Sequence, residues 1–243
     1  MNILCVIPAR AESSRFFEKP LALIAGKPMI QWVYQHCMAV QEFDRVVVAT
    51  DSEKIAAACR SFGAQVVMTS SSHDTATERL YEVSTLIDAD LYVMVNGDEP
   101  LLTREAIVQC IPDVVDRDAI YVSNLMTDFS NPVEVVDATN LKIVTDAHDR
   151  CLFISRSPIP YPKGNMDYVY HKFVGVGAFN RKALEFYHNT ARGPIEKIEE
   201  NDSFRFIENG VPIYYYNCHC KSLSVDTRKD IAGVEAYLAT QGH

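Results

Sequence analysis

RVVVATDSEKIAAACRSFGAQVVMT, residues 45–69, contains the patterns of a strand, a helix and a second strand in immediate succession. RVVVAT (45–50) is short and β-branched, which is typical of a strand buried on both faces. Asp51 and Ser52 follow it and can cap the helix expected over SEKIAAACRSF. Gly63 ends that helix, and AQVVMT is the next strand. Such a unit predicts a parallel sheet with right-handed crossovers.

The same alternation continues on both sides of this unit. Strands are expected in ILCVIP (3–8) and DLYVMVNGDEP (90–100), and helices over 28–40, 75–87 and 103–115. From about residue 120, extended segments follow one another with turns between them, and the chain then returns to helices near 181–189 and 194–204, a strand at 211–218 and a closing helix after 224–227. We therefore expect a single α/β domain over 1–243, with a mainly parallel central sheet and a β-rich lobe at about 120–180.

Composition excludes several classes of function. The chain has 243 residues and a formal net charge of -9, which argues against a general binder of nucleic acid or of an anionic membrane. No stretch approaches the ~20 apolar residues of a membrane span, and MNILCVIPAR does not have the pattern of a signal peptide. Seven cysteines are scattered along the chain, as expected for free thiols in a reducing compartment. These features predict a cytoplasmic protein.

Charged residues gather where the expected strands end. Arg10, Arg15 and Lys19 follow the first strand, and Asp98 follows a later one beside Gly97. Ligands of parallel sheets bind beyond the carboxyl ends of the strands, and a strand-end carboxylate beside a glycine suits Mg²⁺. Taken singly, such acids are more often helix caps or turn residues, and loop cations are most often solvated. Together with Asp226 late in the chain, they indicate a nucleotidyl- or phosphoryl-transfer site.

The segment IPARAESSRFFEKPLALIAGKPMIQWV resembles the N-terminal signature of the CMP-KDO synthetases, the 3-deoxy-manno-octulosonate cytidylyltransferases. Further segments match that family in order along almost the whole chain: VATDSEKI (48–55), MTS followed by TERL (68–80), VNGDEPLL (95–102), ISRSPIP (154–160), PIEKIE (194–199) and SVDTRKDI (224–231). The resemblance implies a Rossmann-like, three-layer nucleotidyltransferase fold. It also implies a homodimer in which the β-rich lobe is a contact surface.

The resemblance implies a transferase (EC 2.7.7 type) of lipopolysaccharide or capsule biosynthesis that moves CMP from CTP to a hydroxyl of an acidic sugar and releases pyrophosphate. Lys19, Arg15, Asp98 and Asp226 would be catalytic, with the two aspartates as Mg²⁺ ligands. The nucleotide-binding residues would be Pro8, Ala9, Arg10, Ser13, Arg15, Lys19, Ser70, Thr77, Asn96, Gly97 and Asp98. The acceptor-binding residues would be Arg79, Glu99, Arg156, His171, Glu196, Asp202 and Arg205.

This chain departs from the family pattern at a few positions. Phe17-Glu18 replaces Pro-Gly in the phosphate loop, and Asn96 replaces Gln. In the acceptor region, FVGVG (173–177) aligns with the family's H-I-G-I-Y, and Asp202-Ser203 aligns with Glu-Gln. Apart from Phe17-Glu18 and Asn96, the nucleotide and metal half is intact, whereas the acceptor half is altered. We expect an anionic acceptor that is KDO or a related acid.

Two other functions fit the same residues. One is the same reaction with another nucleotide, UTP, because Asn96 lies near the expected base site, or with a different small acidic or phosphorylated acceptor. The other is a nucleotide-binding homologue without catalysis, which the joint presence of Arg15, Lys19, Asp98 and Asp226 disfavours.

Overall fold

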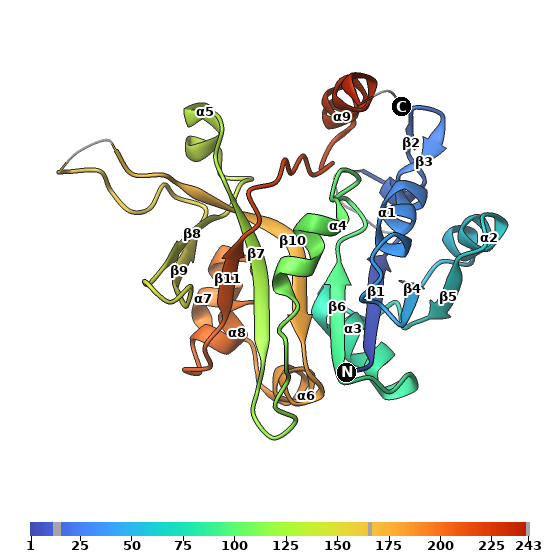
Figure 1. Ribbon diagram of the computed structural model, residues 1–243, viewed down its shortest axis with the longest axis horizontal. Coiled ribbons are helices and arrows are strands. Elements are labelled where there is room, and N and C mark those ends of the chain that lie inside the picture. The colour runs from blue at the N-terminus through green and yellow to red at the C-terminus, as the bar shows by residue number, and fades with distance from the viewer. Residues whose placement is uncertain (12–15, 165–166, 242–243) are drawn as a thin grey trace.

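The computed structural model in Figure 1 describes residues 1–11, 16–164 and 167–241. Its large sheet has the strand order β11-β7-β10-β6-β1-β4-β5, with β8 and β9 paired beside β10. The strands are β1 (Ile3–Ala9), β4 (Arg45–Thr50), β5 (Gln65–Met68), β6 (Leu91–Val95), β7 (Val122–Asp128), β8 (Lys142–Thr145), β9 (Cys151–Ser155), β10 (His171–Phe179) and β11 (Tyr214–Asn217). A separate hairpin joins β2 (Leu23–Ile24) and β3 (Lys27–Pro28).

Strands β6, β1, β4 and β5 are mutually parallel, as the opening segment predicts. Strand β10 runs antiparallel to both β6 and β7 and joins this half of the sheet to the β-rich half. The α/β prediction of a mainly parallel central sheet with a β-rich lobe is confirmed. In Figure 1, β1 starts at the N-terminus and runs toward the end of the molecule where α9 lies.

Helices cover both faces of the sheet, which makes three layers. They are α1 (Met29–Met38), α2 (Glu53–Ser61), α3 (Ala76–Leu86), α4 (Arg104–Ile107), α5 (Pro132–Val136), α6 (Arg181–Asn189), α7 (Pro194–Glu199), α8 (Phe204–Ile207) and α9 (Arg228–Thr240), with 3₁₀ turns η1 (Lys19–Leu21) and η2 (Val108–Cys110). Alternate residues of β1 enter opposite cores: Cys5 and Ile7 pack with α1, α2 and α4, whereas Leu4 and Val6 pack with α3, α6 and α8.

Local capping explains where several helices begin. The Ser52 side chain accepts a hydrogen bond from the Ile55 N–H at the start of α2. Thr75 and Glu78 form a capping box at the start of α3, and Thr227 and Asp230 form another at α9. These are the positions where the sequence predicts the helices to start.

Two expected helices are shorter than their patterns indicate. The helix expected over 103–115 ends after α4 and η2, because Pro112 keeps the preceding Ile111 extended. The helix expected over 194–204 is divided into α7 and α8, because Glu200 turns the chain through a left-handed conformation with φ of 50°.

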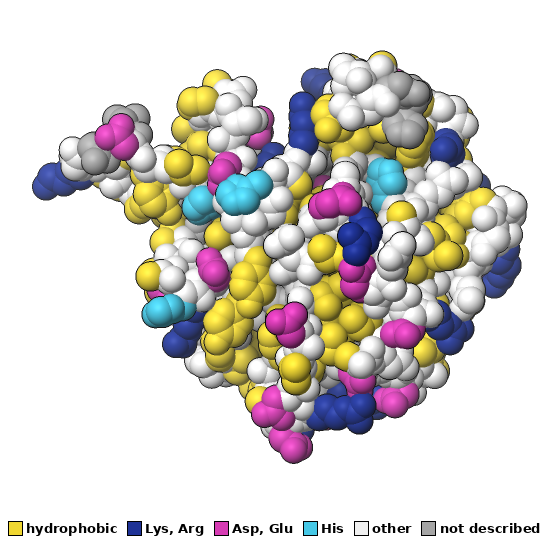
Figure 2. All heavy atoms as spheres, viewed as in Figure 1, with side chains coloured by type: hydrophobic (Ala, Val, Ile, Leu, Met, Phe, Trp, Pro, Cys, Tyr) yellow, Lys and Arg dark blue, Asp and Glu magenta, His cyan; other side chains and the backbone are white. Residues whose placement is uncertain are grey.

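An arm formed by α5, β8, β9 and the described residues between β9 and β10 (156–164 and 167–170) projects from the sheet, and Figure 2 shows a notch between it and the α9 lobe. Lys142 secures the base of this arm. Its side chain is fully buried, and Nζ donates hydrogen bonds to the carbonyls of Asp137 (2.8 Å), Asn140 (2.9 Å) and Arg156 (2.5 Å). Burial lowers the pKa of the Lys142 ammonium. The three carbonyls nevertheless accept its hydrogen bonds.

Replacing Lys142 by Met should destabilise the protein by about 3 kcal/mol, because three carbonyls would lose a charged donor. Urea unfolding followed by circular dichroism measures the change. Lys163→Met, at an exposed position of the same arm, is the matched control and should change stability by less than about 0.5 kcal/mol. Equal stability of the two variants would contradict this role of Lys142.

Candidate active site

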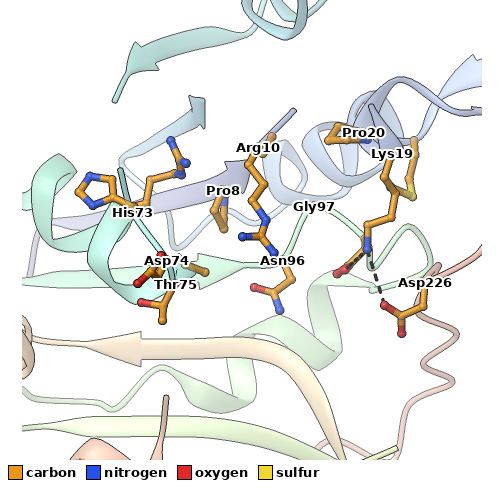
Figure 3. A pocket seen from close by; sticks show the side chains of 15 residues that line it. Pro8, Arg10, Lys19, Pro20, His73, Asp74, Thr75, Asn96, Gly97 and Asp226 are labelled. Atoms are coloured by element: carbon orange, nitrogen blue, oxygen red, sulfur yellow. Dashed lines mark hydrogen bonds and ion pairs between the residues drawn. The ribbon is translucent and has the colours of Figure 1, made fainter. Parts of the chain in front are cut away.

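A cavity of about 310 Å³ opens at the carboxyl ends of β1 and β6. It lies at the sheet edge where ligands of parallel sheets bind. Figure 3 shows Arg10, Lys19, Asn96 and Asp226 directed toward the same space. Predicted site residues that line it are Pro8, Ala9, Arg10, Lys19, Arg79, Asn96, Gly97, Asp98 and Asp226. The structure therefore brings most of the predicted nucleotide and metal set together.

Gly97 allows the ends of two strands to approach closely. A Cβ atom at this position would lie 2.9 Å from the Pro8 carbonyl oxygen and 3.3 Å from Cδ1 of Ile30. The first of these atoms belongs to the backbone of β1 and cannot turn away. Only glycine therefore places Asp98 against the end of the central strand.

Lys19 lies between the two predicted metal ligands. Its Nζ is 2.6 Å from Oδ2 of Asp98 and 3.7 Å from Oδ1 of Asp226, as the dashed lines in Figure 3 mark. The carboxylates are far apart in the sequence, one after β6 and the other just before α9. Two aspartates that converge on a single cation form a donor set suited to Mg²⁺, which takes one or two protein carboxylates and completes its shell with water or phosphate oxygens.

The phosphate loop is described only in part. Arg10 lines the cavity, whereas Ser13 and Arg15 lie outside the described residues. Glu18, which stands where the family has glycine, adopts a left-handed conformation with φ of 52°. Its carboxylate pairs with Lys54 of α2 at 2.5 Å. Lys54 of α2 thus neutralises the charge that Glu18 adds to the phosphate loop. Lys19 remains the charged side chain that the η1 turn directs into the cavity.

The chain between β5 and α3 supplies cavity residues that the sequence analysis did not single out. His73, Asp74 and Thr75 line the cavity, together with Met29 of α1. Glu82 orders this segment, because its Oε2 accepts from the Ser70 N–H (2.9 Å) and lies 2.5 Å from Nε2 of His73. Burial would raise the pKa of Glu82, but the hydrogen bonds from His73 and Ser70 outweigh it and the pKa is lowered. The segment 68–80, which resembles the family, includes His73, and this resemblance was the feature of the sequence that could have identified it.

Arg79 reaches the cavity wall with its charge already paired. Its guanidinium donates to Oδ2 of Asp51 (2.8 Å) and to the hydroxyl of Thr69, and only 2% of the residue is exposed. Asp51 also accepts from the Ala11 N–H at 3.3 Å. Arg79 thus ties the ends of β4 and β5 to the start of the phosphate loop.

Two of the predicted nucleotide residues lie away from the cavity lining. The hydroxyl of Ser70 faces that of Ser72 at 2.8 Å on the surface. Thr77 is buried in α3, and its hydroxyl donates to Oδ2 of Asp202 at 2.6 Å.

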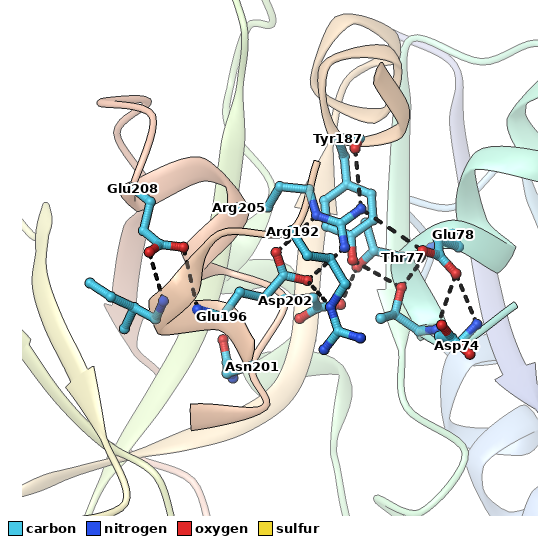
Figure 4. A network of polar contacts seen from close by, with 12 residues as sticks. Asp74, Thr77, Glu78, Tyr187, Arg192, Glu196, Asn201, Asp202, Arg205 and Glu208 are labelled. Atoms are coloured by element: carbon cyan, nitrogen blue, oxygen red, sulfur yellow. Dashed lines mark hydrogen bonds and ion pairs between the residues drawn. The ribbon is translucent and has the colours of Figure 1, made fainter. Parts of the chain in front are cut away.

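Three of the seven predicted acceptor residues, Glu196, Asp202 and Arg205, belong to a buried polar network beside α3, drawn in Figure 4. Arg205 forms a two-point ion pair with Glu196 (2.9 and 2.6 Å) and stacks over the ring of Tyr187. Arg205 and Glu196 are 4% and 0% exposed. Burial raises the pKa of Asp202, which the Thr77 hydroxyl and Arg205 partly oppose. The charge of Arg205 is therefore paired within the protein.

The remaining acceptor residues are also engaged within the protein. Arg156 donates from Nε to the Glu199 carbonyl (2.9 Å), and Nδ1 of His171 lies 2.9 Å from Oδ1 of Asp128. Glu99 is 4% exposed, and burial, with a smaller contribution from Asp98, raises its pKa to about 7. Of the predicted acceptor set, only Arg79 lines the large cavity.

The departures from the family pattern in the acceptor region converge on one place. Phe173, Asp202 and Ser203 line a second, small cavity of about 20 Å³, together with Thr77 and Asn124. A Cβ atom at Gly177, where the family has tyrosine, would lie 2.1 Å from Oδ1 of Asn124. Asn124 therefore fills space at this position and donates to the Tyr215 hydroxyl at 3.2 Å. These substitutions form one repacked region.

Comparison with known proteins decides the family. The cytidylyltransferase family model matches residues 4–220. This chain belongs to that family. The cytidylyltransferase is 39% identical to 3-deoxy-manno-octulosonate cytidylyltransferase of Syntrophotalea carbinolica, over 98% of this chain and 99% of the relative. It is 36% identical to the enzyme of that name from Solibacter usitatus, over 96% of this chain and 93% of the relative.

Solved structures agree with this assignment. A CMP:2-keto-3-deoxy-manno-octonic acid synthetase complexed with CTP superimposes with a TM-score of 0.92 and 33% identity, over 99% of this chain and 100% of that chain. An inositol-1-phosphate CTP transferase from T. maritima, with a TM-score of 0.69 and 11% identity over 98% and 95% of the two chains, shares the fold. The predicted resemblance to the CMP-KDO synthetases and the nucleotidyltransferase class are confirmed. Among the described residues of the cytidylyltransferase, helices long and apolar enough to cross a membrane are absent.

Replacing Gly97 by Ala should lower stability by about 1–3 kcal/mol and weaken CTP binding, because the new methyl group forces the ends of β1 and β6 apart. Thermal unfolding and titration calorimetry with CTP measure the two effects. Gly233→Ala is the control, because a Cβ in α9 meets open space there and should leave both values unchanged or raise stability slightly. Unaltered CTP affinity in the Gly97 variant would show that the close approach is dispensable.

Proposed function

We propose that this protein is a Mg²⁺-dependent cytidylyltransferase that transfers CMP from CTP to a hydroxyl of an acidic sugar of the 3-deoxy-ulosonic class. An acceptor hydroxyl oxygen bonds to the α-phosphorus, the bond from that phosphorus to the bridging oxygen breaks, and pyrophosphate leaves while the hydroxyl proton passes to solvent. The observation that carries this proposal is the convergence of Lys19, Asp98 and Asp226 on one point beside the cavity.

Phosphoryl-type transfer depends on positioning and on neutralising charge more than on a strong base. Asp98 and Asp226 would hold Mg²⁺, which would supply positive charge to the phosphates and the leaving pyrophosphate. The Lys19 ammonium now pairs with the same two carboxylates. A metal ion that takes over this role would free Lys19 to contact a phosphate, next to Arg10 on the cavity wall.

The acidic acceptor is supported by the relatives, whose names specify 3-deoxy-manno-octulosonate. Within the chain, Oδ1 of Asn96 is buried without a hydrogen-bond partner among the described residues, and Asn96 lines the cavity. A buried orphan oxygen favours a substrate that brings a donor, such as a hydroxyl or an amino group. We propose that this acceptor differs from KDO in the part that meets the repacked region around Phe173 and Asn124.

A screen of acids with Mg²⁺ and each nucleoside triphosphate, with pyrophosphate as readout, tests the function. The set contains KDO, an amino-sugar analogue, other 3-deoxy acids and neutral sugars. We expect turnover with CTP and an acid, and discrimination among the acids. Equal turnover of neutral sugars would contradict an acidic acceptor, and faster reaction with UTP would contradict the choice of nucleotide.

Asp98→Asn should reduce pyrophosphate release by at least about a hundredfold, because it removes a charged oxygen from the proposed metal site. Binding of CTP without metal should persist. Asp118→Asn, at a side chain that is 98% exposed, is the matched charge control and should retain full activity. Wild-type turnover by the Asp98 variant would remove this residue from the mechanism.

We propose that the protein is a homodimer that pairs through the arm. Seven of the fifteen large hydrophobic residues that are exposed among the described residues belong to this segment: Val133, Val136, Leu152, Phe153, Tyr161, Tyr168 and Val169. Figure 2 shows hydrophobic side chains gathered over it. Apolar area of this extent indicates an interaction surface.

The double variant Tyr161→Lys/Val169→Lys should be monomeric in sedimentation velocity at concentrations where the wild type is dimeric, because it places two charges in the apolar contact. Val114→Lys, at a residue that is 81% exposed outside the arm, is the control and should leave the dimer intact. A wild type that sediments as a monomer would overturn this proposal.

A further inference from the structure

The segment 218–226 carries Asp226 to the cavity without belonging to a helix or a strand. It leaves β11 at Asn217 and reaches α9 at Arg228. Its backbone is fixed at both ends: the Cys218 N–H donates to the Met126 carbonyl (2.9 Å), and the Val225 N–H donates to the Asp98 carbonyl (2.9 Å). An irregular segment has no hydrogen-bonding pattern of its own, so the position of Asp226 depends on such tethers.

Ser222 is the centre of these tethers. Its hydroxyl donates to the carboxylate of Glu99, 3.0 Å from Oε2 and 3.3 Å from Oε1. Its carbonyl accepts from Nζ of Lys172 in β10 at 2.9 Å, and that ammonium also pairs with Glu134 at 3.3 Å. Ser222 and Glu99 are 5% and 4% exposed, so the hydrogen bonds between them are shielded from water.

Glu99 is enclosed by protein rather than directed to a substrate. Its Oε1 accepts from the Gly175 N–H at 3.1 Å. A Cβ at Gly175 would lie 3.0 Å from Cγ of Glu99 and 2.8 Å from Nδ2 of Asn96. Glu99 therefore occupies a slot that exists because position 175 has no side chain, and it is absent from the lining of the large cavity.

The other side of Asp226 is fixed by the start of α9. The Asp226 N–H donates to Oδ2 of Asp230 at 2.9 Å, and the same oxygen accepts from the Thr227 N–H at 2.6 Å. Asp226 is thus held by the α9 cap on one side and by the Ser222 tether on the other.

We propose that Glu99 is a positioning residue that acts through Ser222 to set the distance between Asp98 and Asp226. Asp98 supplies its own carboxylate to the site. The carboxylate of Glu99, the next residue, holds the segment that carries Asp226. The inference rests on the proposed function in one respect, namely that both aspartates bind the divalent cation.

Ser222→Ala tests the proposal, because it removes the hydroxyl while leaving Glu99, Asp98 and Asp226 in place. The metal probe is Mn²⁺, whose binding to the protein with CTP is followed by electron paramagnetic resonance. We expect the dissociation constant for Mn²⁺ to rise about tenfold, as for other residues that orient metal ligands, while metal-free CTP binding stays within about twofold of wild type. The Mg²⁺ concentration at half-maximal pyrophosphate release should rise in parallel.

Two variants separate positioning from a general loss of stability. Ser123→Ala removes a hydroxyl that is equally buried and donates to the Cys110 carbonyl at 2.7 Å, away from the cavity. It should lower stability to a similar extent without changing Mn²⁺ affinity. Ser222→Thr retains the hydroxyl and should restore most of the affinity. Unchanged Mn²⁺ binding in Ser222→Ala, or an equal loss in Ser123→Ala, would overturn the inference.

The result also separates this inference from the proposed function. If the wild-type protein binds no Mn²⁺ with CTP, the metal role of Asp98 and Asp226 fails, and the inference fails with it. If the wild type binds Mn²⁺ and Ser222→Ala binds it equally well, the metal site stands and only the positioning role of Glu99 is refuted.

Discussion

The ion pairs of Lys19 with Asp98 and Asp226 connect three distant parts of the chain at one point. Without a counter-cation, the two carboxylates would repel each other in this half-buried setting, and the segments that carry them would move apart. The edge of the sheet is therefore organised around a positive charge. Gly97, the η1 turn and the segment before α9 all serve to bring side chains to that charge.

The sheet follows from local patterns because its parallel half is built from units that the sequence specifies separately. Short apolar strands, caps such as Ser52 and Thr75, and helices between them give an order that the right-handed crossover rule allows. The expected helix boundaries were wrong where one residue overrides a good periodic pattern. Pro112 stops one helix, and the left-handed Glu200 divides another. The hairpin of β2 and β3 and the short α5 were not predicted, because each has too few residues to produce a periodic signal.

The predicted site residues also fall into two groups: those whose position the fold determines and those whose contacts the local sequence does not determine. Predicted residues at strand ends line one cavity because the end of a parallel strand fixes their position, as for Arg10, Asn96 and Asp98. The roles of the predicted acceptor residues depend on which partner each side chain contacts, and the local sequence does not determine that partner. Arg79 pairs with Asp51 and Arg205 with Glu196, in contacts that span 28 and 9 residues of chain. His73 was missed because its position depends on its contact with Glu82, which lies nine residues further along the chain in α3.

The space taken by Asn124 beside Gly177 makes these two positions interdependent. A large side chain cannot enter at residue 177 while the Asn124 amide remains, and removing that amide alone deprives the Tyr215 hydroxyl of a donor in the core. Neither step is favourable by itself, so a return to the family's arrangement requires both at once. The packing at position 177 is thereby protected against drift by single substitutions, and redesign of this region has to treat β7 and β10 as one unit.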